Sequence, residues 1–340
     1  MSFFILIFKK NLIMTFKWFL KFYFSLLFSL FCTYIYFAIN QKNIYMNREF
    51  PMWQYVKAVM KGDSSDYNLI ILGDSRSKAG LKPDHIDDEF FKSVNLSVGG
   101  GTPIEGFYIL KNYISKNIIP KYLVISFSPN HLSHIDSFWD RTVKFNFLSY
   151  KNLNEVVDFS RKNEGCDGLI GCEKKIYKYF LYPQKYFKEV YFGLSKRNWL
   201  INQETFDYAV STRGHAIFGT SKFSDGKNVE SNINYKFEPT FTINHYFIET
   251  IKLAKENNMQ IFYYTMPFNK SSFQKTSNLN KLLYDNYLSS ICLKYQIKCL
   301  NKLYFLPNTA FGDPHHLYNG TKQVSFDLRN RLLSNVEKDF

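Results

Sequence analysis

The sequence predicts an α/β fold in which helices cover both faces of a parallel sheet. Short runs of apolar, β-branched and aromatic residues alternate along much of the chain with segments whose apolar residues have helical spacing. The chain has 340 residues, of which 46% are hydrophobic and 19% aromatic, so it can bury a large core. Strands that alternate with helices in this way are typical of parallel sheets.

The expected strands are short and continuously apolar, as strands buried on both faces are. They span residues 68–73, 93–98, 121–128, 259–267 and 297–302. The expected helices have helical spacing of apolar residues, and the first begins with a proline, where a missing N–H costs nothing. They span residues 103–117, 242–258, 279–295 and 320–335.

The alternation fails between residues 131 and 240. This span is rich in lysine, tyrosine and phenylalanine and has no regular spacing. Long unpatterned stretches in compact domains are usually functional lids or poorly ordered loops. We therefore expect an insertion at 131–240, after the third strand. It is either a cap that binds an acidic glycan, through residues such as Lys174, Lys175 and Lys178, or a solvated loop.

The N-terminal part of the chain predicts a membrane anchor. Residues 22–39 contain no charged residue and are long enough to cross a hydrocarbon core of about 30 Å. Because lysines are in excess before this stretch, we expect residues 1–21 in the cytoplasm and the rest outside it. Residues 40–65 would form a stalk, and residues 66–340 a periplasmic or extracellular domain. The alternatives are a cleaved signal peptide, for which no A-x-A-like site follows, and a buried soluble helix.

The chain is basic, with a net charge of +14 from 43 Lys and Arg against 29 Asp and Glu. A charge of this sign suits nucleic acid, an anionic membrane surface or an acidic polymer. The sequence has no zinc-finger spacing, no RNP-like string and no heptad repeat. We therefore expect no nucleic-acid partner.

Four of the five cysteines are close to one another in sequence, Cys166 with Cys172 and Cys292 with Cys299. They are either two local disulfides of an oxidising compartment or four ordinary thiols. Neither pair has the spacing of a zinc site, and Cys32 lies in the apolar N-terminal stretch.

Small and polar residues follow each of the first three expected strands. Gly73-Asp74-Ser75 ends the first, residues 99–103 follow the second, and residues 128–131 follow the third. The carboxyl ends of parallel strands meet at one edge of the sheet, where ligands bind. We therefore expect a site at this edge.

The glycines of the second loop do not predict a nucleotide cofactor. Ile104 stands where G-x-G-x-x-G requires its third glycine, and Phe107 stands where a Walker loop requires its lysine. We expect no cofactor.

The partners that a catalytic serine needs occur near residue 315. Asp313 and His316 are three residues apart, so their side chains fall on one side of a turn. A carboxylate there can hold the histidine tautomer whose Nε2 acts as a base, and the Ser75 hydroxyl is a weak nucleophile without such a base. The sequence therefore predicts a catalytic triad of Ser75, His316 and Asp313. His315 is the alternative base, although the D-x-x-H spacing favours His316.

Taken together, these blocks resemble the SGNH (GDSL-type) hydrolase superfamily over roughly residues 66–335, apart from the insertion. The resemblance implies a flavodoxin-like three-layer sandwich and an acyl-enzyme formed on Ser75. It also implies an oxyanion hole made by the Ser75 N–H, the Gly100 N–H and the Asn130 amide. Gly99 or Gly101 are alternatives to Gly100, and Ser128-Pro129-Asn130-His131 replaces the usual G-x-N-D block.

Within this superfamily, the anchor and the phrases GDSRS and SPNH resemble the membrane-anchored branch. That branch includes the alginate O-acetylation proteins and the D-alanine transfer protein of teichoic acids. The resemblance implies an O-acyltransferase, with acetyl as the expected acyl group, acting on a cell-surface polysaccharide beside a multi-pass membrane acyltransferase. The alternatives are a carbohydrate esterase with the same triad and a non-catalytic glycan-binding subunit.

Other side chains at the expected site have two interpretations each. Arg76 would bind an anionic substrate group or form a salt bridge within the protein. His131 would line the cleft and contact substrate, or ligate a metal with His134 and Asp136. No further ligand can be identified, so we expect no metal site.

Overall fold

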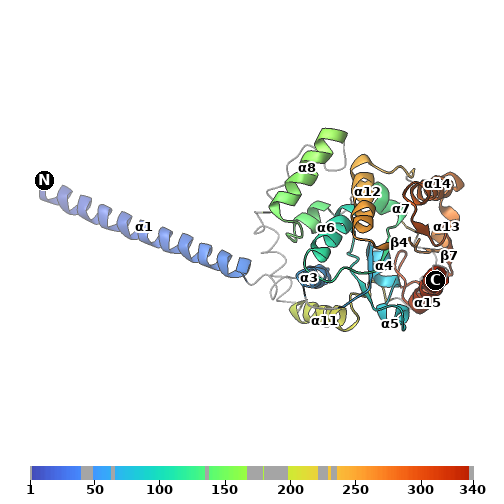
Figure 1. Ribbon diagram of the computed structural model, residues 1–340. Helices are drawn as coiled ribbons and strands as arrows, with labels where there is room; N and C mark the ends of the chain where they lie inside the picture. Colours follow the sequence, from blue (N-terminus) through green and yellow to red (C-terminus); the bar gives the residue numbers. More distant parts are fainter. Residues whose placement is uncertain are drawn as a thin grey trace. The chain divides into compact units, whose positions relative to one another are not determined.

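The computed structural model describes residues 2–39, 49–62, 66–134, 138–166, 179, 198–220, 229–230 and 236–336. The chain divides into two compact units. One comprises Met1–Met46 and Pro183–Trp199, and the other comprises Asn47–Tyr182 and Leu200–Phe340. Figure 1 shows the helices and strands of both.

The first unit contains the helix α1 (Ser2–Ile39). Its 22 residues Thr15–Tyr36 have a mean hydropathy of 1.5, which makes them long and apolar enough for a membrane span. No part of this stretch is buried in the protein, and Phe22 and Phe28 are each 68% exposed. The described part of the chain therefore has an N-terminal apolar helix of the kind found in signal sequences and membrane anchors. Its apolar stretch begins earlier than the predicted 22–39.

The second unit is built on a parallel sheet of five strands. These are β1 (Leu69–Gly73), β2 (Ser93–Asn95), β3 (Tyr122–Ser126), β4 (Gln260–Tyr263) and β6 (Lys298–Cys299). Their order across the sheet is β2-β1-β3-β4-β6, which is the strand order of flavodoxin-like folds. Five strands occur where the sequence predicts them, and the α/β class is confirmed.

Helices cover both faces of this sheet (Figure 1). On one face, α6 (Pro103–Ile114) and α12 (Phe241–Glu256) pack against each other. On the other face lie α4 (Ser75–Gly80), α5 (Pro83–Ile86) and α15 (Thr321–Val336). Leu69 and Ile71 of β1 are fully buried against Val324 and Leu328 of α15. Since alternate strand residues point to opposite faces, the unit is a three-layer sandwich, as predicted.

Further elements follow β4. They are the short parallel sheet of β5 (Phe268–Asn269) and β7 (Phe305–Leu306), the helices α13 (Lys270–Lys275) and α14 (Asn278–Tyr295), and the 3-10 helix η2 (Asn308–Ala310). The predicted helices correspond to α6, α12, α14 and α15. Local sequence explains the start of α6, where Thr102 and Glu105 form a capping box and Pro103 occupies the first turn.

The predicted stalk differs from the structure. α3 (Phe50–Val59) belongs to the second unit and is buried, with Trp53 only 1% exposed. The Trp53 ring packs edge-on against Phe145 and Phe147, with ring centroids 5.6 and 4.8 Å apart. Burial of these aromatic rings stabilises α3 against the rest of the second unit. The globular unit therefore begins before residue 66.

The described part of the insertion contains several helices, and most of it belongs to the second unit. It contains most of α7 (Pro129–Ser133), the π-helix η1 (Phe138–Val143), α8 (Tyr150–Glu164) and α11 (Asn198–Ser211). After α11, the Arg213 carbonyl accepts a hydrogen bond from the Asn95 N–H at 2.9 Å, and its guanidinium pairs with Asp84 and Asp87. The segment thus lies beside the edge strand β2. Lys174, Lys175 and Lys178 lie outside the described residues.

Candidate active site

Ser75 lies where β1 passes directly into α4. Asp74 caps this helix, because its side chain accepts a hydrogen bond from the Arg76 N–H at 2.9 Å. Gly73 is required for a steric reason, since a Cβ atom there would clash with the Ser126 carbonyl oxygen and the Ser77 side chain. The strand therefore ends in glycine because β3 and α4 approach it closely, and the next two residues present Ser75 at the edge of the sheet.

The structure brings the three predicted triad residues together. His316 Nε2 lies 2.8 Å from Ser75 Oγ, although the two residues are 241 positions apart. His316 Nδ1 lies 2.7 Å from Asp313 Oδ2. Asp313 Oδ1 accepts hydrogen bonds from the backbone N–H groups of His315 and His316, at 2.8 and 2.7 Å. The loop thus holds the carboxylate in one orientation.

The Asp313 carboxylate also decides which nitrogen of His316 carries the proton. Burial would raise the pKa of Asp313, but the hydrogen bond from His316 and its charge lower it to about 2. An ionised carboxylate only accepts hydrogen bonds, so the neutral imidazole carries its proton on Nδ1. Nε2 is then free to accept from the Ser75 hydroxyl, as general-base activation requires.

Part of the insertion packs against the triad, which sequence reasoning did not find. The Phe218 ring stacks on the His316 imidazole, with centroids 4.5 Å apart and planes 20° apart. The next residue, Gly219, is in close contact with the backbone of Gly312 and with the Asp313 side chain. No periodic pattern marks this segment in the sequence, so its position depends on the tertiary structure.

Lys78 of α4 is fully buried and binds the same segment of the insertion to this helix, which begins at Ser75. Lys78 Nζ donates to the Ser97 and Gly214 carbonyl oxygens, each at 2.9 Å. Burial lowers the pKa of Lys78 to about 7, because the charged form loses its hydration. Lys78 thereby links α4, the loop after β2 and the insertion.

Asp74 joins the first and third loops of the predicted site. Its Oδ2 accepts from the Ser128 N–H and from His131 Nδ1, each at 2.8 Å. Burial would raise the pKa of Asp74, but the hydrogen bond and charge of His131 and the charge of Arg76 together lower it. His131 therefore faces Asp74 through Nδ1, and its contact with substrate remains a prediction. Asp136 lies outside the described residues, which contain no cluster of three or more potential metal ligands.

The predicted oxyanion donors lie on the loops after β2 and β3. Gly100 has φ +66° in a turn that the Gly101 N–H closes on the Val98 carbonyl at 3.0 Å, and this φ favours glycine. Gly100 stays the predicted donor of this loop, with Gly99 and Gly101 as the alternatives. Asn130 lies in the first turn of α7 and lines a pocket. Their function as oxyanion donors remains a prediction.

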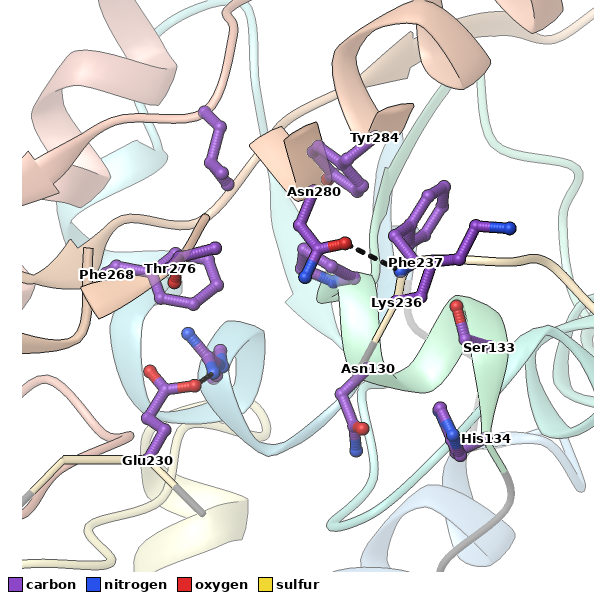
Figure 2. Close-up of a pocket in the computed structure, with 13 residues that line it drawn as sticks. Asn130, Ser133, His134, Glu230, Lys236, Phe237, Phe268, Thr276, Asn280 and Tyr284 are labelled. Carbon is purple, nitrogen blue, oxygen red and sulfur yellow. Dashed lines mark hydrogen bonds and ion pairs between the residues drawn. The ribbon is translucent and has the colours of Figure 1, made fainter. Parts of the chain in front are cut away.

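Figure 2 shows this pocket, which the residue after the serine, Arg76, also lines. Arg76, Asn130, Glu230 and Phe268 are among its lining residues. Arg76 is only 6% exposed, forms an ion pair with Glu230, and lies 4.4 Å from the centre of the Phe268 ring. The structure thus contains the salt bridge given above as the alternative for Arg76. Sequence reasoning missed Glu230, which has no motif around it.

His315 lies beside this ion pair. Its Nδ1 is 3.7 Å from Glu230 Oε2, whereas His316 contacts Ser75. The geometry thus agrees with the choice of His316 as the base.

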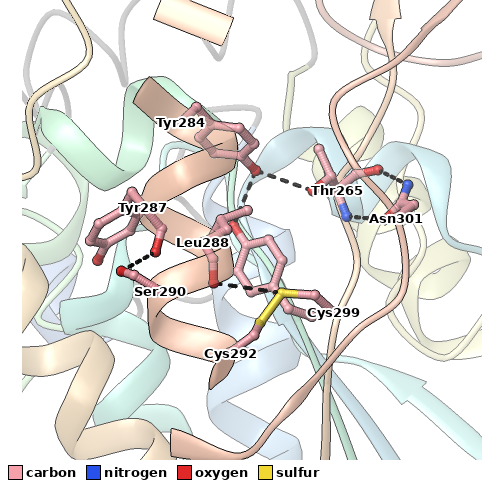
Figure 3. Close-up of a disulfide and its surroundings, with 9 residues drawn as sticks. Thr265, Tyr284, Tyr287, Leu288, Ser290, Cys292, Cys299 and Asn301 are labelled. Atoms are coloured by element: carbon pink, nitrogen blue, oxygen red, sulfur yellow. Dashed lines mark hydrogen bonds between the residues drawn. A yellow bond between two sulfur atoms is a disulfide. The ribbon is translucent and has the colours of Figure 1, made fainter. Parts of the chain in front are cut away.

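One wall of the pocket belongs to α14, which carries Asn280 and Tyr284. The far end of this helix is joined to β6 by the disulfide Cys292–Cys299, with Cα atoms 6.0 Å apart (Figure 3). Of the two alternatives given above for this pair, the structure has the disulfide. Cys166 is also disulfide-bonded, and its expected partner Cys172 lies outside the described residues.

No family model and no curated protein sequence matches the chain. Among solved structures, it is similar to a putative acylhydrolase from Bacteroides fragilis NCTC 9343. The two chains are 10% identical, with a TM-score of 0.36, and the match covers 84% of this chain and 94% of the other. At this level of similarity, the interpretation of the site depends on its own geometry.

Proposed function

We propose that the protein is a serine-dependent acyl-transfer enzyme of the SGNH type, anchored in the membrane by α1. Its substrates are ester-linked acyl groups of a cell-surface polysaccharide. One observation carries the proposal: the chain of contacts from Ser75 Oγ through His316 to Asp313, at 2.8 and 2.7 Å. A serine at a strand–helix turn, a histidine and a half-buried carboxylate in this order are the parts of a nucleophilic triad.

The geometry supports the following reaction. Ser75 Oγ attacks the carbonyl carbon of the acyl ester while His316 Nε2 takes its proton, and Asp313 stabilises the resulting imidazolium. The oxyanion of the tetrahedral intermediate would be bound by the N–H groups of Ser75 and Gly100 and the Asn130 amide. Collapse expels the alcohol, which receives the proton from His316, and leaves the acyl group on Ser75. A sugar hydroxyl or water then attacks this ester while His316 accepts its proton. Collapse of the second tetrahedral intermediate releases the new ester or the free acid, and His316 returns the proton to Ser75 Oγ.

Transfer and hydrolysis share this acyl-enzyme, and the resemblance to membrane-anchored O-acetylation proteins favours transfer. In that case a multi-pass membrane acyltransferase would supply the acyl group, with acetyl as the expected one. The disulfide Cys292–Cys299 supports a location outside the cytoplasm, because disulfides persist in oxidising compartments.

The acyl-enzyme is tested on the full-length chain in detergent micelles with a fluorophosphonate probe and a chromogenic acetyl ester. We expect labelling at Ser75, and a loss of turnover of at least ~10³-fold in both Ser75→Ala and His316→Ala. The double variant should lose little more, because triad residues act as a unit. Ser211→Ala is the control, since this hydroxyl only bonds the Tyr208 carbonyl at the surface.

Wild-type turnover by Ser75→Ala would refute the mechanism. A folded protein with neither labelling nor turnover would favour the non-catalytic glycan-binding subunit.

The proposed membrane topology has its own test. Alkaline phosphatase joined after Arg48 should be active, and a reporter that works only in the cytoplasm should be silent there. The reverse pattern would exclude a surface polysaccharide as substrate.

A further inference from the structure

The loop that carries Gly100, the predicted oxyanion donor, is fixed at both of its ends. At its start, the Val98 N–H donates to the Gly73 carbonyl oxygen at 3.1 Å. Gly101 is also close to this oxygen, because a Cβ atom added to Gly101 would lie 3.2 Å from it. The capping box of α6 begins with the next residue, Thr102. The loop is therefore held between β1, which ends beside the serine, and α6.

A carboxylate from outside the sheet packs against the same loop at Gly99. A Cβ atom added to Gly99 would lie 2.6 Å from Glu49 Oε2 and 3.8 Å from Phe218 Cε1, so a side chain there would displace the carboxylate. Phe218 is the ring that stacks on the His316 imidazole. Glu49 therefore lies where the loop of the oxyanion hole meets the ring that covers the catalytic histidine.

Arg141 of η1 holds this carboxylate at two points. Its Nη2 donates to Glu49 Oε1 at 2.7 Å, and its Nε lies 2.7 Å from Oε2. Its third nitrogen, Nη1, lies 3.5 Å from the Gly99 carbonyl oxygen. Two contacts between a planar guanidinium and a carboxylate fix their relative orientation as well as their distance. Both members of the pair thus contact Gly99 in a defined geometry.

The elements that carry this pair are themselves anchored. Trp53 of α3, the helix that Glu49 precedes, packs on Phe145. The Phe145 N–H donates to the Arg141 carbonyl oxygen at 2.7 Å. The next residue, Thr142, donates from Oγ1 to Glu105 Oε1 at 2.6 Å, and Glu105 belongs to the capping box of α6. The pair is therefore held by packing on one side and by the end of the loop on the other.

The pairing also removes a charge that would oppose catalysis. Burial raises the pKa of Glu49, and the charges of Arg141 and His316 oppose this rise. A carboxylate without a counter-ion in this position would repel the negative charge that develops on the substrate oxygen. Because Arg141 compensates its charge, Glu49 can support the loop without this repulsion.

We propose that Glu49 and Arg141 are positioning residues for the oxyanion hole, which hold the loop at Gly99 so that the Gly100 N–H points at the substrate oxygen in the transition state. The inference rests on the proposed function, because the Gly100 N–H is an oxyanion donor in that mechanism. The sequence placed Glu49 in a stalk, outside the expected domain, so its contact with this loop was not foreseen.

The test compares Glu49→Gln, Arg141→Gln and the double variant in the full-length protein in detergent micelles. Active sites are counted by complete labelling with the fluorophosphonate probe, and kcat and KM are measured with the chromogenic acetyl ester. Trifluoroacetone probes the oxyanion hole directly. Ser75 Oγ adds to its carbonyl carbon while His316 takes the serine proton, and the oxygen of this adduct mimics the oxyanion of the tetrahedral intermediate.

We expect kcat/KM per active site to fall by ~10-fold to ~10²-fold in each single variant, which is less than the loss of a whole oxyanion donor. The inhibition constant of trifluoroacetone should rise by the same factor. KM should stay within about threefold, because the position of the loop matters only once the oxyanion forms. The double variant should lose no more than Arg141→Gln alone, because both changes break one pair and the second removes the carboxylate that the first leaves without a counter-ion.

The matched control is Arg331→Gln on α15. Arg331 Nε lies 2.8 Å from Asp327 Oδ2, and its Nη1 donates to the Leu300 carbonyl oxygen at 2.8 Å, so this change also breaks a pair of arginine and carboxylate and a contact with the backbone. It should leave the inhibition constant unchanged. Misfolding lowers the number of labelled sites but not the affinity of each site, so the inhibition constant separates positioning from stability.

Arg141→Lys keeps the charge but not the two-point contact, so it should recover part of the loss. It also decides the matter if the Gln variants yield no labelled sites, because an unchanged inhibition constant in Arg141→Lys would then overturn the inference.

The inference would also be overturned by unchanged kcat and inhibition constants in both Gln variants, by a change in KM alone, or by an equal rise in the inhibition constant of Arg331→Gln. Losses that multiply in the double variant would show that the two residues do not act as a pair. With a labelled, active wild type, each of these results leaves the proposed function standing. A wild type with neither labelling nor turnover would overturn both.

Discussion

Replacing Asp313 by asparagine should inactivate the site by trapping His316 in the wrong tautomer. Asp313 Oδ1 accepts two backbone N–H groups, and Oδ2 accepts from His316 Nδ1. If the asparagine oxygen takes the place of Oδ1, its NH₂ group faces Nδ1 and can only donate. Nδ1 must then accept, and the imidazole proton moves to Nε2, which faces the Ser75 hydroxyl. In this state His316 cannot act as a base.

The size of the effect follows from the two backbone hydrogen bonds. If the amide of the Asp313→Asn variant instead flips so that its oxygen faces His316 Nδ1, the imidazole keeps its proton on Nδ1 and Nε2 can act as the base. The backbone N–H groups of His315 and His316, which are 2.8 and 2.7 Å from Oδ1 in the wild type, then lose their acceptor. Each lost bond costs about 1–3 kcal/mol, or about 2–6 kcal/mol for both. Since about 1.4 kcal/mol is a factor of ten, the productive orientation becomes roughly 30-fold to 10⁴-fold rarer. We expect kcat/KM to fall by that factor.

The assay is turnover of a chromogenic acetyl ester by the full-length protein in micelles, with Asp207→Asn as a surface control. Asp313→Ala should retain more activity than Asp313→Asn, because alanine offers no donor that selects the wrong tautomer. It should also exceed Ser75→Ala, which removes the nucleophile itself. An Asp313→Asn enzyme within threefold of the wild type would refute the role of this carboxylate. Equal losses in the Ala and Asn variants would refute the tautomer argument.

Two further predictions concern side chains that hold the site together. Burial on folding lowers the pKa of Lys78 from 10.5 to about 7, so the unfolded chain binds more protons between these pH values. Wild-type stability relative to Lys78→Met should therefore rise with pH, by up to about 1.4 kcal/mol per unit. Urea unfolding from pH 6 to 10 measures this, and a pH-independent difference would contradict the buried lysine. Phe218→Ala should lower kcat several-fold with little change in KM, because His316 loses the ring stacked on it. Phe218→Leu should recover part of the loss, and unchanged kcat in Phe218→Ala would show that the stacking does not orient the base.

The sheet and the triad were predictable because each depends on a local pattern. The apolar run before Gly73 reads as a buried strand in any context, and the Asp313–His316 spacing puts both side chains on one side of a turn. The start of α6 is also marked locally, because proline is favoured at the first position of a helix and Pro103 follows the capping residue Thr102. Parallel topology then placed the loops at one edge of the sheet.

The other parts of the site depend on contacts that no short pattern records. Glu230 is an ordinary acidic residue until the fold places it against Arg76, which is 154 positions earlier. Phe218 lies in a stretch without periodicity, and only the fold stacks it on His316, about a hundred residues later in the chain. The stalk prediction was wrong for a similar reason, because the aromatic partners of Trp53 are about ninety residues away.

The separation of Ser75 from His316 has a consequence for the protein's synthesis. All 241 positions between the hydroxyl and its base must be made before the two can meet. At about 5–20 residues per second, this takes on the order of ten to fifty seconds. Throughout that time the Ser75 hydroxyl has no base beside it. The contacts among Ser75, His316 and Asp313 therefore form only late, after the segment carrying Phe218 and the loop carrying Asp313 have both been made.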